Sequence, residues 1–228
     1  GMRMGDGTEG LAPDRIVRTV EASLRRLKTD HIDLLYAHMD DTSVPLEDVL
    51  ETFDKLVRTG KVRALGASNY SASRLAEALD ISEANNFSRF EVLQPLYNLV
   101  ERSAFEGELE DVCRERQIGV LPYFGLASGF LTGKYRSLED AAGSARSAMV
   151  QGYLDERGKR VLAAMDAVAA QTGGTLAQIA LAWLAGKPQI SAPIASATSV
   201  EQVENLLGAS RLSLDEEMMR QLDAASAP

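Results

Sequence analysis

The sequence is poor in the residues that mark several common classes of protein. It has one cysteine, Cys113, in 228 residues, so an internal disulfide is impossible, which fits a reducing cytoplasm. It has no run of about 18 apolar residues, the length that a membrane-spanning helix needs. The formal net charge of -9 argues against nucleic-acid and anionic membrane partners. We therefore expect a cytoplasmic protein that binds neither nucleic acid nor membrane.

What the chain does contain is enough apolar sequence for a large core. Hydrophobic residues make up 45% of the 228 positions. Barrels of alternating strands and helices often reach this length as one domain. We expect residues 1–228 to form a single domain. Trp183 lies in an apolar helical segment and is expected to pack in the core.

Hydrophobic periodicity predicts strands that alternate with helices. Apolar runs of strand length occur at residues 32–37, 61–69, 90–97, 118–123 and 190–195. Helical spacing predicts helices at residues 13–28, 45–60, 74–83, 105–116, 157–171, 175–184, 200–207 and 214–224. Strands that are apolar on both faces and alternate with helices are typical of a parallel sheet covered by helices.

Two architectures fit this alternation. A closed (β/α)8 barrel needs eight strands, so five predicted strands would be its last five strand-helix units, with three more expected upstream. The alternative is a small doubly wound sheet. Against that alternative, no glycine-rich phosphate turn follows a strand and precedes a helix.

Residues 125–152 interrupt the regular pattern. This stretch has little apolar periodicity and is longer than most connections in compact domains. Long connections of this kind often serve binding or catalysis. We interpret it as an irregular loop that shapes a ligand site.

The chain is organised around the stretch KVRALGASNY, residues 61–70. It is predicted to be a buried strand that ends in Ser68 and Asn69, at the end where α/β folds place their ligands. The alternative is that these two residues only cap the following helix.

The ends of the other predicted strands are also polar or aromatic. They carry His38, Gln94 with Tyr97, Tyr123, and Ser196 with Thr198. Capping does not readily explain all five strand ends. Together they predict a polar pocket with an aromatic wall, suited to a flat ring that bears an amide. No set of metal ligands is indicated.

These motifs resemble the aldo-keto reductases, a family of (β/α)8 barrels that use a nicotinamide cofactor. The family pattern is a basic residue, an apolar residue, Gly, then Ser, Asn and an aromatic, found here as Arg63, Leu65, Gly66, Ser68, Asn69 and Tyr70. Four further segments carry the resemblance: residues 22–38, 93–99, 129–135 and 193–206. The resemblance covers essentially the whole chain.

The resemblance implies a role for residues at the strand ends. His38 matches the histidine that donates a hydrogen bond to the substrate carbonyl, whereas His31 is expected to be structural. Ser68, Asn69 and Gln94 match the groups that hold the nicotinamide carboxamide, and amide side chains offer both a donor and an acceptor. Tyr123 matches the aromatic that stacks on the nicotinamide ring.

The resemblance also implies sites for the rest of the cofactor. Leu126 and Ser128 lie where the family contacts the pyrophosphate, although Phe124-Gly125 replaces the usual Ser-Pro before Leu126. The adenosine end corresponds to Ser196, Thr198, Gln202 and Asn205. Many members place a cation at the position of Thr198 to pair with the 2′-phosphate of NADP, and a neutral Thr gives up that contact. The expected cofactor is therefore NADP, with NAD possible.

The expected activity is NAD(P)H-dependent reduction of an aldehyde or ketone, with a small carbonyl compound as substrate. The family's catalytic Asp, Tyr and Lys are expected upstream of Gly1, and a general acid is typically worth 10²–10⁴-fold in rate. We therefore expect residues 1–228 alone to be a poor catalyst with unpaired sheet edges. The alternative is a non-catalytic member that binds nucleotide and has a regulatory or structural role.

Overall fold

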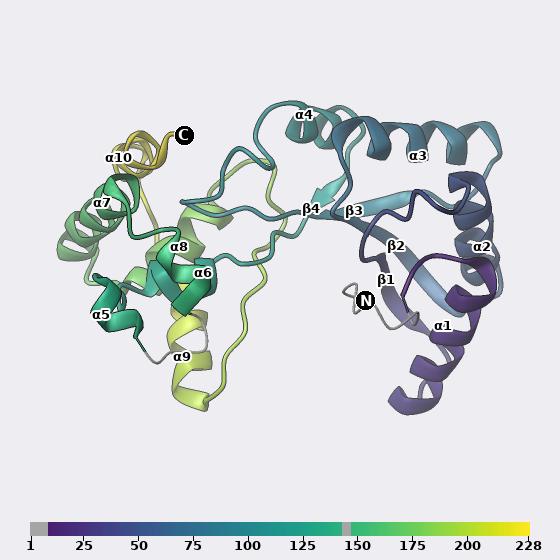
Figure 1. Cartoon of the computed structure of the whole chain (residues 1–228), viewed down its shortest axis with the longest axis horizontal. Helices are drawn as coiled ribbons and strands as arrows, with labels where there is room; N and C mark the ends of the chain where they lie inside the picture. The colour runs from purple at the N-terminus through teal and green to yellow at the C-terminus, as the bar shows by residue number, and fades with distance from the viewer. Residues whose placement is uncertain (1–8, 143–146) are drawn as a thin grey trace. The chain divides into compact units, whose positions relative to one another are not determined.

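The computed structural model describes residues 9–142 and 147–228, which form two compact units. Unit 1 contains residues up to Pro95 together with Glu108–Val120, and unit 2 contains Leu96–Gly107 together with Leu121–Pro228 (Figure 1). We describe each unit by itself. The expectation of a single domain stays a prediction.

Unit 1 is a four-stranded parallel sheet. One helix precedes the first strand, and one helix lies between each strand and the next along the chain. The strands lie in the order β1 (Ile32–Ala37), β2 (Val62–Ser68), β3 (Phe90–Gln94) and β4 (Gly119–Val120). The helices are α1 (Pro13–Leu27), α2 (Leu46–Arg58), α3 (Ala72–Ala84) and α4 (Glu108–Glu115). Strand order in space equals strand order in the chain, and each helix packs against the next one.

The two faces of this sheet differ in burial. Register aligns Ala37, Ala67, Leu93 and Val120 in one row across the sheet, and all four are fully buried. The adjacent row contains Tyr36 and Val92, which are only half-buried. The four helices gather on one side of the strands (Figure 1). A doubly wound sheet reverses its strand order and carries helices on both faces, so that alternative is wrong for unit 1.

Proline and glycine shorten three of the predicted elements. The strand predicted at 90–97 ends at Gln94, because Pro95 has no N–H for the sheet ladder. The strand predicted at 118–123 is reduced to Gly119–Val120, and Pro122 follows closely. The helix predicted from residue 105 begins at Glu108, directly after Gly107 with its positive φ of 98°.

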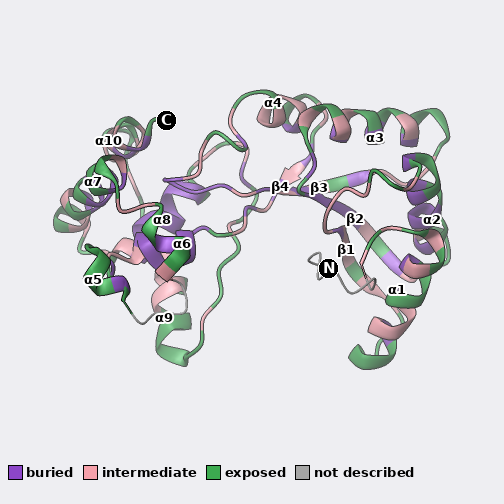
Figure 2. Cartoon of the chain, viewed as in Figure 1, coloured by how far each residue is buried: buried purple, intermediate pink, exposed green. Residues whose placement is uncertain are grey.

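Unit 2 is mainly helical. Its long helices are α7 (Glu156–Thr172), α8 (Leu176–Ala185), α9 (Val200–Gly208) and α10 (Glu216–Ser226), with the 3₁₀ turn η2 (Ala209–Arg211) after α9. Helix α8 packs against α7 and α9, and α7 packs against α10. Trp183 on α8 is fully buried, as expected. Figure 2 shows buried residues concentrated on α8 and exposed residues on α9.

Two predictions for unit 2 are wrong. Residues 190–195 form no strand: only Ile190 makes a bridge, and Ile194 N donates to Pro122 O at 3.0 Å. Pro122 and Pro193 each lack an N–H, so a continuous ladder between these segments cannot form. Residues 125–152 are not wholly irregular, because they contain η1 (Ala127–Thr132), α5 (Leu138–Ala141) and α6 (Ser147–Gln151). These helices are too short to give a clear periodic signal.

Candidate functional site

The predicted site residues of unit 1 come together at the carboxyl ends of β1, β2 and β3. Ser68 pairs with Gln94 in the sheet register, and its Oγ donates to the Gln94 backbone oxygen at 2.8 Å. The Asn69 amide nitrogen donates to the His38 backbone oxygen at 2.8 Å and to Ser68 Oγ at 3.1 Å. These bonds tie the ends of the three strands into one rigid rim.

The backbone at Asn69 explains why this residue type suits the rim. Asn69 has φ = 57°, the left-handed region that asparagine tolerates better than most residues. Helix α3 is capped by Ser71, whose side chain accepts from Arg74 N at 3.2 Å. The alternative that Ser68 and Asn69 only cap this helix is therefore wrong.

Tyr36 on β1 and His38, directly after β1, carry polar atoms that the described residues leave without hydrogen-bond partners. Tyr36 is the fifth residue of β1, and His38 directly follows Ala37, the last residue of that strand. The buried Nδ1 atom of His38 and the buried hydroxyl of Tyr36 have no hydrogen-bond partner in the described part of the chain. An unpaired buried polar group costs about 1–3 kcal/mol, so such groups often indicate a ligand site.

Sequence reasoning missed two features of this rim. Arg74 Nε donates to both carboxylate oxygens of Asp40 at 3.1 and 3.0 Å, which fixes the loop after β1 to α3. The second feature is Tyr36 on β1, whose neighbour in the sheet is Gly66. That glycine opposite an aromatic was the available signal.

In unit 2, the predicted ring and pyrophosphate residues lie around a chain of tight turns. Tyr123 is half-buried, and burial, with a smaller effect of Glu101, raises its pKa. Its ring packs edge to face against the ring of Phe124, with 5.3 Å between the two ring centroids. Leu126 is half-buried, and buried Ser128 has φ = 57° and donates to Met149 Sδ at 3.4 Å. The contacts support an ordered turn, and the ligand roles stay predictions.

The predicted adenosine residues separate into two groups. Thr198 and Gln202 bond to each other: Gln202 Oε1 accepts from Thr198 N at 2.9 Å and from Thr198 Oγ1 at 3.1 Å. Both are exposed, as is Ser196. Asn205 instead accepts from Thr175 Oγ1 at 3.0 Å and from Gln178 on α8. The side chain of Asn205 is thus used to join α9 to the start of α8.

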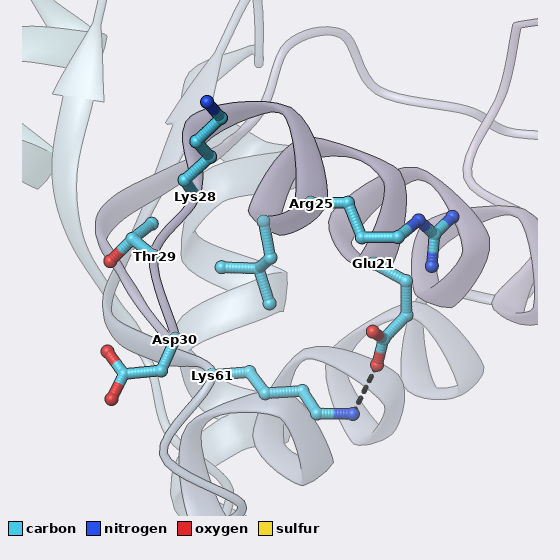
Figure 3. Close-up of a pocket in the computed structure, with 7 residues that line it drawn as sticks. Glu21, Arg25, Lys28, Thr29, Asp30 and Lys61 are labelled. Atoms are coloured by element: carbon cyan, nitrogen blue, oxygen red, sulfur yellow. Dashed lines mark hydrogen bonds and ion pairs between the residues drawn. The ribbon is translucent and has the colours of Figure 1, made fainter.

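A depression in unit 1 lies at the amino ends of β1 and β2 (Figure 3). It is wide open and lined mainly by charged side chains, with Glu21 and Lys61 forming an ion pair. Asp30 and Lys61 come just before their strands, at the end of the sheet opposite Ser68 and Gln94. In barrel folds this end generally serves stability, and the ligand site lies at the other end.

Residues 9–142 and 147–228 contain neither a cluster of metal ligands nor a membrane-spanning helix. No three His, Cys, Asp or Glu side chains gather there as a metal site would require. None of the helices described is long and apolar enough to cross a bilayer.

A parallel sheet with its strands in chain order and polar residues at their carboxyl ends is typical of ligand-binding α/β proteins. Comparison with known proteins then identifies the family. The aldo/keto reductase family model matches residues 2–227. The chain therefore belongs to the aldo/keto reductase family, whose fold is a (β/α)8 barrel.

Individual relatives support the assignment. The chain is 36% identical over 214 residues to the uncharacterized oxidoreductase YrpG of Bacillus subtilis, covering 94% of this chain and 64% of that protein. It is 33% identical over 216 residues to the aldo-keto reductase AFTS1 of Alternaria alternata, covering 95% and 58%. It is 32% identical over 210 residues to a probable voltage-gated potassium channel subunit beta of Arabidopsis thaliana, covering 88% and 62%. The chain thus spans less than two thirds of the length of these relatives.

Proposed function

We propose that the rim formed by His38, Ser68, Asn69 and Gln94 binds the nicotinamide end of a cofactor, NADP or NAD, and that the protein reduces an aldehyde or ketone. The observation that carries the proposal is the hydrogen-bonded joining of three strand ends beside Nδ1 of His38, which has no hydrogen-bond partner among the described residues. Its family and its oxidoreductase relatives support the same reaction class.

The chemistry of these residues fits a nicotinamide cofactor. Gln94 offers the donor and acceptor that a carboxamide requires, on a backbone fixed by Ser68. His38 is held through its own backbone oxygen, so its ring is anchored at the strand end. We propose that this ring donates a hydrogen bond to the substrate carbonyl oxygen and so orients the carbonyl. The bound cofactor would supply the hydride.

For unit 2 taken by itself, we propose the roles that the family resemblance implies: Tyr123 for the nicotinamide ring face, Leu126 and Ser128 for the pyrophosphate, and Ser196, Thr198, Gln202 and Asn205 for the adenosine end. Exposure of Thr198 and Gln202 supports this for those two residues. Support is weakest for Asn205, because its side-chain oxygen already accepts hydrogen bonds from Thr175 and from Gln178 on α8. A neutral Thr198 supports acceptance of NAD beside NADP.

The test of the proposal is calorimetric titration of NADPH and NADH into the chain. Asn69→Ala should weaken binding by about 1–3 kcal/mol, because it releases the ends of β1 and β2. The matched control is Asn85→Ala, at the exposed end of α3, which should bind like the wild type. Equal affinity in wild type and Asn69→Ala would remove this rim from the cofactor site.

A second candidate function is that of a nucleotide-binding subunit without catalysis. Three relatives, from Arabidopsis thaliana, Oryza sativa and Schizosaccharomyces pombe, carry the names probable (the first two) or putative (the third) voltage-gated potassium channel subunit beta. A reductase assay with a panel of aldehydes separates the two candidates. Turnover that falls at least tenfold in His38→Ala supports the enzyme, and cofactor binding without any turnover supports the subunit.

A further inference from the structure

We propose that Tyr36 is a positioning residue that reaches across β2 and orients the side chain of Gln94 for the cofactor. The inference rests on the proposed function of the rim and adds a residue that the family pattern did not assign. It depends on the sheet register, on the space above Gly66 and on the surroundings of the Tyr36 hydroxyl.

The register places Tyr36 and Gln94 two strands apart. Tyr36 on β1 pairs with Gly66 on β2, and Gly66 pairs with Val92 on β3. Gln94 is two residues beyond Val92, so its side chain lies on the same face of the sheet. Neighbouring strands are about 4.8 Å apart, so β1 and β3 are separated by roughly 10 Å. A side chain that links them must cross β2.

Gly66 opens this crossing. A Cβ atom built on Gly66 would lie 2.5 Å from Cε1 and 2.6 Å from Cδ1 of Tyr36, distances that real Cβ atoms essentially never show. The phenol ring therefore occupies the place of the missing side chain and lies over β2. Any residue with a side chain at position 66 would push the ring away.

The hydroxyl of Tyr36 consequently lies near Gln94. Burial raises the pKa of the Tyr36 phenol, and the side chain of Gln94 opposes that rise. The polar contact between them falls short of a full hydrogen bond, because the hydroxyl has no partner that meets bonding geometry among the described residues. Gln94 is thus the polar side chain that the phenol influences, while its backbone is held by Ser68.

The hydroxyl of Tyr36 beside Gln94 is better explained by a role in binding than by a contribution to stability. The two ends of a glutamine amide are similar in size, so a polar neighbour is needed to select one orientation, and a hydroxyl can donate or accept. Packing over Gly66 needs only the ring, which phenylalanine would also supply. An incompletely bonded buried hydroxyl lowers stability, and its replacement by an apolar group is often neutral or favourable.

The decisive variant is therefore Tyr36→Phe. We expect its thermal transition to be unchanged or higher than that of the wild type, while its dissociation constant for NADPH rises about fivefold to tenfold. In a Gln94→Ala background the same change should have no further effect, because the side chain that Tyr36 orients is gone. Wild-type affinity in Tyr36→Phe, or full additivity with Gln94→Ala, would overturn the inference. Absence of NADPH binding by the wild type would instead overturn the proposed function.

A second measurement needs no cofactor. Tyrosine labelled with ¹³C at Cζ reports the titration of each phenol by NMR, and Tyr36→Phe assigns the signal. Gln94→Leu should raise the pKa of Tyr36 further, since the group that opposes the effect of burial is removed. Gln171→Leu, at an exposed position on α7, is the control and should leave it unchanged. An unchanged Tyr36 pKa in Gln94→Leu would overturn the contact on which the inference rests.

Discussion

The two units hold their candidate site residues by different means. In unit 1, sheet register brings Ser68 beside Gln94, and a hydrogen bond from Asn69 joins His38, which directly follows β1, to the same rim. In unit 2, Ser128 depends on positive backbone angles, and Thr198 depends on a local bond to Gln202. Register follows from residue alternation, whereas turns depend on contacts made later in folding. A site at strand ends is therefore easier to infer from sequence than one in turns.

The chain carries a natural probe for each unit. Cys113, its only cysteine, is fully buried on α4 in unit 1, and burial raises its thiol pKa to about 12. Thiol reagents should therefore report when unit 1 opens. Trp183, its only tryptophan, is fully buried in unit 2, so its fluorescence reports that unit.

The largest expected effect is in unit 2. Arg102 donates to Glu106 at 2.8 Å, to the Asp223 backbone oxygen at 2.8 Å and to Ser226 at 2.9 Å, and its side chain is 12% exposed. Arg102→Ala should lower the stability of unit 2 by about 3–5 kcal/mol, because it removes three hydrogen bonds and the cation that pairs with the Glu106 carboxylate. Urea unfolding followed by Trp183 fluorescence measures the loss.

The control is Arg220→Ala, whose side chain is 66% exposed, and its effect should stay within about 0.5 kcal/mol. Cys113 reactivity should be unchanged in both variants. An equal shift of both probes in Arg102→Ala would contradict the separation into two units.

The next effect is in unit 1. Gly66→Ala should destabilise this unit by about 2–3 kcal/mol, because the new Cβ would overlap the Tyr36 ring. Earlier reaction of Cys113 during urea unfolding measures this loss. Gly152→Ala is the control, since a Cβ at Gly152 meets nothing within 4 Å. Gly66→Ala with wild-type stability would show that Tyr36 does not lie over β2.

A smaller effect concerns acid stability. Asp54 is buried and accepts from Ser88 N at 2.8 Å and Arg58 Nε at 2.5 Å. Burial acts to raise the Asp54 pKa, but the bonds from Ser88 and Arg58 outweigh it, so the pKa lies below its ordinary value of 3.8. A lowered folded pKa gives stability that is present above the unfolded value and is lost as pH falls through the folded one.

Asp54→Asn should therefore cost about 1–2 kcal/mol at pH 7, and the difference from wild type should shrink as pH falls below about 4. Thermal melts across this pH range measure it. The control is Glu51→Gln on the same helix, whose carboxylate pairs with Lys55 at an exposed site. A stability difference between wild type and Asp54→Asn that grows toward acid pH would show that the Asp54 pKa is raised, not lowered, by folding.

The smallest expected effect tests unit 2 as the adenosine end. With neutral Thr198, NADPH and NADH should differ in affinity by less than about 100-fold, or 2.7 kcal/mol. Thr198→Arg should tighten NADPH by roughly fivefold through the 2′-phosphate and leave NADH, the internal control, unchanged. A larger wild-type preference would indicate another cation, and no gain in the variant would remove Thr198 from this end.

Much of the fold could be predicted because its signals are local. The strand at Ile32–Ala37 was predicted to the residue, since six residues of strand character stand between a helix and a polar turn. The strand predicted at residues 190–195 was wrong. An apolar run does not reveal that Pro122 and Pro193, on two distant segments, prevent a ladder of backbone hydrogen bonds between them. The grouping of His38, Ser68, Asn69 and Gln94 followed from strand ends. The place of Tyr36 did not, because it depends on the space above Gly66 in a neighbouring strand.

The central claim is that the carboxyl end of the unit 1 sheet is the cofactor end. An NMR titration of the ¹⁵N-labelled chain with NADP⁺ tests it most directly, because both ends of the sheet are observed at once. The account predicts shifts at the side-chain amides of Asn69 and Gln94 and at Ser68 N–H. Thr29 and Lys61, in the depression at the amino end (Figure 3), should stay fixed. Shifts that gather at Thr29 and Lys61 and leave Asn69 and Gln94 unchanged would contradict it.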